Sequence, residues 1–154
     1  MSDVIFQVTD LAQKRLELLE AARGGGARLR DKDGTSLVML PEGRLLLLEE
    51  LANWSTAHLR LDELISRGKR PSVGDLGNLA WLRVFDDEDL REFTHDLQQA
   101  LIASYADRDL APLHDCVEAW RLTAQQLEDP LRRHVLLGKV APQDLVEALR
   151  PDEQ

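Results

Sequence analysis

The chain has 154 residues, of which 44% are hydrophobic, and this is enough for one ordinary domain or two small ones with a real core. Its net charge of −9 is uneven, because residues 1–71 balance eleven basic against eleven acidic side chains, whereas residues 72–154 hold the other eight basic and seventeen acidic ones. An acidic protein is repelled by phosphates, but a neutral first half can still present a basic face. No apolar run approaches the roughly 20 residues that span a bilayer, the start lacks a signal pattern, and the lone Cys116 excludes an internal disulfide, so we expect a cytoplasmic protein.

Residues 4–51 organise the rest of the chain, and their periodicity predicts a strand, a helix, a hairpin and a second helix. After a strand at Val4–Val8, Thr9 can serve as the N-cap of a helix that runs to Arg23. Its apolar positions recur at spacings of three and four and form one stripe: Leu11, Ala12, Leu16, Leu18, Leu19 and Ala22. Gly24–Gly26 follows a helix and precedes a strand, the reverse of the order in phosphate-binding loops. We therefore interpret it as a helix C-cap and turn.

The hairpin follows these glycines. Arg28–Arg30 alternates as a half-buried strand does, Asp33–Gly34 is a strong turn signal, and Ser36–Leu40 is a β-prone run that Pro41 closes. The expected fold class is α+β, with a small antiparallel sheet and helices, followed by an all-helical C-terminal domain. Because so small a sheet cannot bury a core alone, we expect helices on one face and a second copy of the domain.

The next segment is rich in leucine. The run Arg44–Trp54 is apolar on nearly every side, as suits a helix shared between a sheet and a dimer mate. Asn53–Ser55 can break this helix and start another one, which Gly68 ends. The stretch Arg67–Pro71 is the best linker candidate, because Gly and Pro flank it and its charges solvate it. We therefore predict two domains, residues 1–68 and 69–154.

The second half predicts helices only. Ser72 starts one that continues toward Phe85, and the acidic run Asp86–Asp89 suits the start of the most regular helix in the chain. Helices at 88–106 and 110–127 should pair as an antiparallel hairpin. Two further short helices are expected after Asp129 and from Pro142.

The stretch 4–51 resembles the dimerising, DNA-binding N-terminal domain of the Phd/YefM (prevent-host-death) antitoxins. Members begin with a strand, a Val-Thr-Glu-Leu-like helix start, a helix, a Gly, a strand, a basic turn with Gly, a second strand and a helix. The residues that correspond, in register and without a gap, are Val8–Leu11, Leu19, Arg23, Gly25, Leu29, Gly34, Leu37, Val38 and Leu40. Residues 93–137, including Asp109–His114 and Trp120–Arg121, also look like small actinobacterial helical domains of unassigned function, some of them beside type II toxin genes.

The first resemblance implies DNA contact by basic side chains at the start of the first helix and in the turn between the strands. Carried over, these positions are Ala12, Gln13 and Lys14, with Arg15 next, and Lys32 and Asp33 in the turn. Two positions that are often basic are thus Ala12 and Gln13, and acidic neighbours flank Lys32, which should weaken phosphate binding. Arg28 and Arg30 partly compensate from one strand face. The candidate DNA-binding residues are therefore Lys14, Arg15, Arg28, Arg30 and Lys32.

In this family the C-terminal region binds and neutralises the toxin. The candidates here are Leu97, Leu101, Val117 and Trp120, although residues of this type at this spacing are mostly core residues. Three tryptophans and regular leucine stripes predict that this region is folded already, rather than ordering on binding. The expected partners are a second copy and a toxin of RelE-like, Fic-like or PIN-like type.

Catalytic and metal chemistry find little support. The histidines, His58, His95, His114 and His134, fall on different predicted helices, and Cys116 near His114 lacks an orienting motif. We expect no enzyme, no cofactor and no metal. Two hypotheses follow: a type II antitoxin that represses its own promoter, or a homodimeric interaction or adaptor protein that kept the fold and lost DNA binding.

Overall fold

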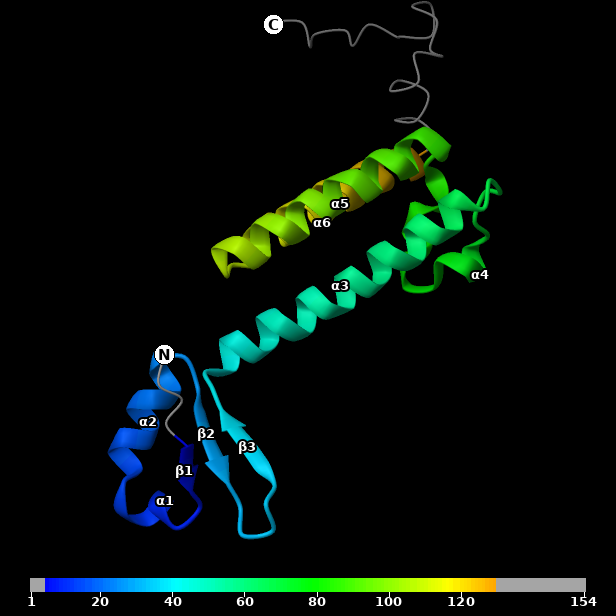
Figure 1. Ribbon diagram of the computed structural model, residues 1–154. Coiled ribbons are helices and arrows are strands. Elements are labelled where there is room, and N and C mark those ends of the chain that lie inside the picture. The colour runs from blue at the N-terminus through cyan, green and yellow to red at the C-terminus, as the bar shows by residue number, and fades with distance from the viewer. Residues whose placement is uncertain (1–4, 130–154) are drawn as a thin grey trace, which may run out of the picture. The chain divides into compact units, whose positions relative to one another are not determined.

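The protein, described by a computed structural model over residues 5–129, has an α+β fold with one three-stranded sheet and many helices (Figure 1). By compactness the chain divides into two units, Met1–Trp54 and Ser55–Gln154, which we call the sheet unit and the helical unit. This division falls inside a helix, whereas the sequence suggested a boundary after Gly68. No helix in the described part of the chain is both long and apolar enough to cross a membrane.

The sheet unit begins with strand β1 (Ile5–Gln7), followed by helices α1 (Asp10–Gln13) and α2 (Arg15–Gly24). The expected single helix is therefore two, broken at Lys14, whose φ of −118° and ψ of 32° are not helical. Thr9 occupies the N-cap position without a side-chain capping bond, and the Asp10 carboxylate accepts instead from the Gln7 N–H at 2.8 Å. The break leaves Leu11 and Leu16 exposed, so the predicted apolar stripe is only partly buried.

The sheet is mixed, and its strands lie in the order β1-β2-β3. Strand β2 (Ala27–Arg30) runs parallel to β1 and antiparallel to β3 (Ser36–Met39). The prediction of an antiparallel sheet was therefore wrong for β1. The reason is the connection, because α1 and α2 form a helical crossover that returns the chain to the start of β1 before β2 begins.

Glycines with positive φ make possible the turns on either side of β2. Gly25 and Gly26 have φ of 148° and 135°, and the N–H of Gly26 donates to the Ala21 carbonyl at 3.1 Å, so this run ends α2 as expected. In the β2–β3 turn, Gly34 has φ of 90° and donates to the Asp31 carbonyl, while the Asp31 N–H donates to the Thr35 carbonyl at 2.8 Å. This is a three-residue hairpin loop with a glycine bulge.

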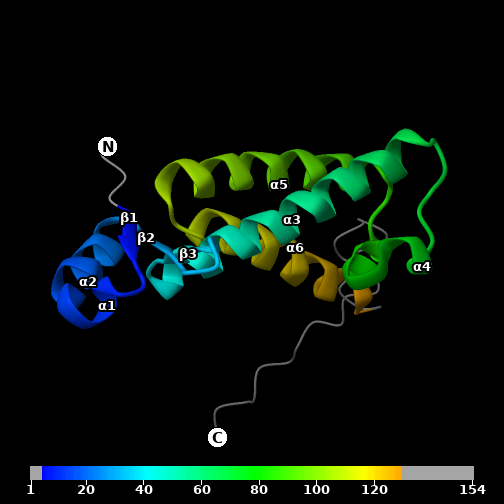
Figure 2. The same cartoon turned by 60° about the horizontal axis from the view of Figure 1, so that its bottom comes forward.

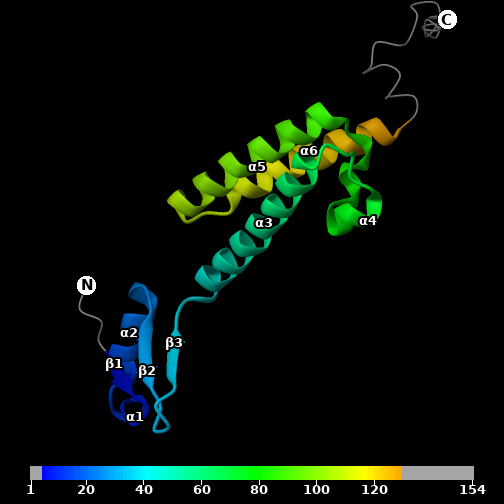
Figure 3. The same ribbon diagram turned by 45° about the vertical axis from the view of Figure 1, so that its right-hand side comes forward.

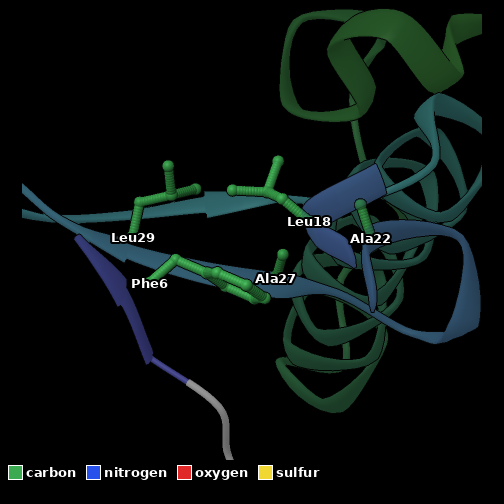
Figure 4. Packing of buried hydrophobic residues seen from close by; sticks show 5 residues of the cluster. All are labelled: Phe6, Leu18, Ala22, Ala27 and Leu29. Carbon is green, nitrogen blue, oxygen red and sulfur yellow. The ribbon is translucent and has the colours of Figure 1, made fainter. Parts of the chain in front are cut away.

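A small hydrophobic cluster joins α2 to one face of the sheet, and Figure 4 shows its side chains facing one another. Strand β2 alternates strictly, with two buried residues facing α2 and two arginines on the opposite face. The members of the cluster are Phe6, Leu18, Ala22, Ala27 and Leu29. Strand β3 contributes no buried residue.

Helix α3 (Glu42–Ser66) is continuous, so the predicted break at Asn53–Ser55 was wrong. Neither Gly nor Pro occurs there, and the modest helix cost of Asn and Ser is outweighed by the good helix formers around them. Near its start, Arg44 donates a hydrogen bond to the Gly25 carbonyl. Among the leucines of the 44–54 run, Leu51 is buried, whereas Leu45, Leu46 and Leu48 are about half exposed.

The helical unit continues through α4 (Val73–Leu76) into the 3-10 helix η1 (Gly77–Val84). Ser72 and Asp75 form the expected capping box, but Gly77, with φ of 56°, ends the α-helix early. The loop before α4 is fixed, because the Arg70 guanidinium donates to the carbonyls of Arg83 and Phe85 at 3.0 and 2.7 Å. This stretch was predicted to be a linker, because Gly and Pro flank it and its charges solvate it.

Helices α5 (Asp87–Asp107) and α6 (Ala111–Glu128) pack against each other as an antiparallel hairpin, as predicted (Figure 2). Asp86 caps α5 by accepting from the N–H groups of Glu88 and Asp89. At the turn, buried Ser104 accepts from the Asp109 N–H through its carbonyl and from the Leu113 N–H through its hydroxyl. The helices expected after Asp129 and from Pro142 lie outside the described residues.

Candidate functional site

The basic residues of the sheet unit gather partly at one end of the sheet. Because β1 and β2 are parallel, the elements that follow them, α1 and the β2–β3 turn, lie at the same end, as Figures 1 and 3 show. Lys14 and Arg15 lie at the α1–α2 junction, and Lys32 lies in the turn. All three are exposed. We call this place the basic end.

Arg28 and Arg30 lie on the sheet face opposite α2, which we call the open face. Cross-strand pairing sets Arg28 between Ile5 and Val38, and Arg30 between Gln7 and Ser36. Arg30 is the last residue of β2 and therefore adjoins the basic end, whereas Arg28 lies two residues earlier in the strand and farther from that end. The five candidate DNA-binding residues are thus divided between an end and a face of the sheet unit.

Three carboxylates reduce the net positive charge of the basic end, and each also has a structural role. Asp10 lies 3.7 Å from the Lys14 ammonium, and Asp31 accepts from the backbone N–H of Lys32 at 2.6 Å. Asp33 accepts from the Thr35 N–H at 2.8 Å, and hydrogen bonds from the backbone and hydroxyl of Thr35 hold the pKa of Asp33 below its ordinary value. These acids shape the turn and the start of α1, but they leave little net positive charge there.

The sheet unit also exposes much apolar surface. Nine large hydrophobic residues of its described part are exposed: Ile5, Leu11, Leu16, Leu37, Val38, Met39, Leu45, Leu46 and Leu48. Three of them are the last three residues of strand β3, and three more lie on the first turns of α3. An apolar surface of this extent on a small unit is typical of a protein interface.

In the helical unit, the predicted partner-binding residues belong largely to the interior. Leu97 is fully buried and Val117 is 7% exposed, while Leu101 and Trp120 are partly exposed. The Trp120 indole N–H donates to the Asp96 carboxylate at 3.1 Å. In this conformation, therefore, only Leu101 and Trp120 can contact a partner directly.

Trp120 belongs to a ring of four aromatic side chains packed edge to face. Its centroid lies 5.2 Å from Phe85 and 5.6 Å from Phe93, and both phenylalanines also contact Trp81. The Arg121 guanidinium lies 5.6 Å from the centre of the Trp81 ring. Trp81 was not among the residues predicted to form a site. This ring joins η1 to both helices of the hairpin, and its role is packing.

Two exposed residues of α5 are better placed for a partner. Ile102 is 58% exposed and Tyr105 is 70% exposed, three residues apart on one helix face near the acidic turn that holds Asp107 and Asp109. The spacing of Leu90, Phe93, Leu97, Leu101 and Tyr105 by three and four predicts one buried stripe on α5, but Tyr105 is exposed. Ile102 was not among the predicted partner-binding residues, although a large apolar residue directly beside such a stripe is itself a signal.

Other chemistry has few candidates. Among residues 5–129 no group of three His, Cys, Asp or Glu side chains could hold a metal, and His134 lies outside that range. Burial, and then the nearby Asp96, raise the pKa of the half-buried Cys116 thiol, which opposes thiolate chemistry. A small surface hollow beside α5 has a mixed lining, in which Ile65 and Leu90 lie among charged groups of both signs, Lys69, Arg91 and Asp87.

Comparison with known proteins adds one finding. Residues 80–154 match the model of a family described as a family of unknown function (DUF6247). The match starts just before Trp81 and includes the aromatic ring, α5 and α6, so it falls within the helical unit. No curated protein and no solved structure matches the chain.

Proposed function

We propose that this protein is the antitoxin of a type II toxin–antitoxin pair, acting in the cytoplasm as a homodimer without catalytic activity. The observation that carries the proposal is the order of elements in the sheet unit, strand–helix–helix–strand–strand–helix, together with its exposed apolar surface. Apart from the first helix, which is broken in two, this is the order of elements that the resemblance to Phd/YefM antitoxins implied, and it supports the proposal. The acidic helical unit would then bind the toxin.

Promoter DNA would bind at the basic end, where Lys14, Arg15, Arg30 and Lys32 are exposed. Phosphate neutralisation supplies most of such affinity, so binding should weaken steeply with salt. The test is a gel shift with the DNA upstream of the gene at low and moderate salt. Reversing Arg30 and Lys32 to Glu should abolish the shift, whereas reversing Arg91 and Arg121 in the helical unit changes the net charge equally and should preserve it. Wild-type protein that shifts nothing at either salt removes this half of the proposal.

The toxin would bind the apolar pair Ile102 and Tyr105, whose acidic surroundings attract a basic protein. Co-expression with the product of the neighbouring gene tests this half by co-purification. The double variant Ile102→Ser with Tyr105→Ala should lose the partner, whereas Leu122→Ser, which also changes an exposed apolar residue, should retain it. If the wild-type protein does not co-purify with the neighbour, the antitoxin assignment fails.

A second candidate is a homodimeric adaptor that does not bind DNA, and the carboxylates built into the basic end favour it. Asp33→Asn separates the two, because an amide keeps the acceptor for Thr35 while removing one negative charge beside Lys32. For a DNA-binding protein the affinity should rise about two- to fivefold, since solvent and salt screen the effect of one exposed charge. For an adaptor, neither this change nor reversal of Lys14, Arg15, Arg28 and Arg30 to Glu should alter its behaviour in cells.

A further inference from the structure

The turn between α5 and α6 holds one residue in an unfavourable backbone conformation. Arg108, the C-cap residue of α5, has φ of 55° and ψ of 37°. Among residues 5–129 it is the one residue other than glycine with a positive φ. Glycine is the usual residue in this left-handed conformation at the end of a helix, because a Cβ atom crowds the backbone there. The arginine therefore strains the turn.

Hydrogen bonds to Ser104 hold the turn in this conformation. The N–H groups of Arg108 and Asp109 both donate to the Ser104 carbonyl. The Ser104 hydroxyl accepts from the Leu113 N–H at 3.1 Å, so one residue of α5 joins the turn to the first turn of α6. Ser104 is completely buried. The backbone at Arg108 therefore cannot relax, and its side chain starts from a fixed point.

The charges of the turn do not explain why an arginine stands there. A helix dipole favours cations in the last turn, but α5 has no basic residue in that turn and ends in Asp107. A cation at position 107 would offset the dipole without strain. Arg108 is exposed, and its guanidinium forms no ion pair or hydrogen bond with the described residues. A strained residue without a side-chain contact in the fold points to a use outside the fold.

The surroundings of Arg108 indicate what that use is. The exposed residues Ile102 and Tyr105 precede it on α5 at a spacing of three. Tyrosine and arginine are two of the residue types that are enriched at the energetic centres of protein interfaces. Asp107 and Asp109 flank Arg108, so the turn presents charges in the order negative, positive, negative.

We propose that Arg108 is a specificity-determining contact with the protein partner and binds one of its carboxylates, while Asp107 and Asp109 face cations of that partner. A guanidinium binds a carboxylate through two parallel hydrogen bonds, so it fixes the position of the partner more narrowly than the acidic charge around it. A partner surface that is basic throughout would place a cation against Arg108 and be rejected. The inference rests on the toxin of the proposed function and names the charge pattern of its binding surface.

Urea unfolding of the protein alone tests whether Arg108 is strained. Arg108→Gly should raise the urea midpoint by about 0.3 M, because glycine adopts a positive φ freely. Arg108→Lys keeps both the Cβ atom and the charge, and it should leave the midpoint unchanged. A lower midpoint for Arg108→Gly would show that the side chain serves the fold, and would overturn the proposal.

Binding to the purified product of the neighbouring gene, measured by calorimetry, tests the role of the side chain. Arg108→Gly should raise the dissociation constant about tenfold or more, although it stabilises the protein. Arg108→Lys should recover only part of this loss, because an ammonium group cannot form the two parallel hydrogen bonds. Arg91→Ala removes another exposed arginine from the same helix and should bind as the wild type does.

A charge exchange tests the carboxylate. Arg108→Glu should abolish binding, and replacing one carboxylate residue of the partner by arginine should restore it. If no such partner variant restores binding, the carboxylate contact is wrong. Binding that tolerates both Arg108→Gly and Arg108→Glu overturns the inference but leaves the toxin–antitoxin pair standing. A wild-type protein that does not bind the neighbouring gene product overturns both.

Discussion

The two units of this protein handle their apolar residues in opposite ways. In the helical unit, Phe85, Phe93 and Leu97 are almost completely buried, and an aromatic ring ties η1 to the α5–α6 hairpin. In the sheet unit the interior is a cluster of five residues. Nine of the fourteen exposed large hydrophobic residues in the described chain lie in this smaller unit, so the proposed homodimer would form through the sheet unit.

The two units also differ in charge. The helical unit, residues 55–154, holds nineteen acidic against twelve basic side chains, whereas the sheet unit, residues 1–54, holds nine against seven and is nearly neutral. The difference separates two kinds of association. The sheet unit is suited to a permanent apolar contact, and the helical unit to a contact guided by charge with two exposed apolar residues.

The largest effect should come from the aromatic ring. Phe93→Ala removes a fully buried side chain that contacts both tryptophans of the ring, and it should lower the free energy of unfolding by about 3–5 kcal/mol. Urea titration followed by tryptophan fluorescence measures the change. Tyr105→Ala, in the same helix but exposed, should stay within about 0.5 kcal/mol. A loss at Phe93 below about 1 kcal/mol would mean that the helical unit is not organised around this ring.

Concentration should distinguish the two units next. If the sheet unit is completed by a second copy, mass action stabilises it by about 1.4 kcal/mol per dimer for each tenfold rise in protein concentration. Hydrogen exchange should therefore slow with concentration in peptides from residues 5–40. Peptides from residues 87–128 serve as the internal control and should exchange at unchanged rates. An equal change of exchange rate with concentration in both regions would show that association does not stabilise the sheet unit in particular.

A smaller effect is expected at the ion pair between Arg83 and Glu128, whose atoms Nη2 and Oε1 are 2.5 Å apart. Both side chains are nearly half exposed, so solvent screening limits the pair to about 0.2–1 kcal/mol. Glu128→Gln should lower the free energy of unfolding by that amount at low salt, and by less at high salt. Glu118→Gln, an equal change of charge on the same helix, controls for net charge. A loss that does not depend on salt would point to packing instead.

The smallest effect concerns the β2–β3 turn. Hydrogen bonds from Thr35 lower the pKa of Asp33, so the folded state favours its carboxylate. The contribution to stability is then fully present above the ordinary value of 3.8 and is lost as the pH falls through the lower folded value. NMR titration of the Asp33 carboxyl should show the depressed pKa, and Thr35→Val, which removes the hydroxyl but keeps the backbone N–H, should remove only part of this depression. An ordinary pKa in the wild-type protein would argue against this turn geometry.

Much of the fold could be predicted because its signals are local. The capping residues Ser72 and Asp86, the Asp33–Gly34 turn and the leucine spacing of α5 each involve residues a few positions apart. The direction of β1 could not be predicted from β1 itself, since pairing with β2 depends on the path of the crossover between them. The break at Lys14 has no glycine or proline to announce it, and we find no physical account of it in the sequence.

The sequence predicted which types of residue form the candidate sites, but not which of these residues are exposed. Arg28 and Arg30 were correctly expected on one exposed strand face, because alternation fixes that face. Periodicity alone does not say which turns of a stripe the neighbouring helix covers. Leu97 was therefore named for a partner although it is buried, while Tyr105, at the end of the same stripe, proved to be exposed.

The mixed sheet also has a consequence for the order of folding. Strands β2 and β3 are joined by a tight turn and can meet within microseconds, as can the helices of the α5–α6 hairpin. Strand β1 pairs later, because its partner β2 lies beyond the whole helical crossover. Closing that loop costs conformational entropy before the contacts between the strands form. Docking of β1 is therefore the late step of the sheet unit, and until it occurs β2 and β3 each have a free edge.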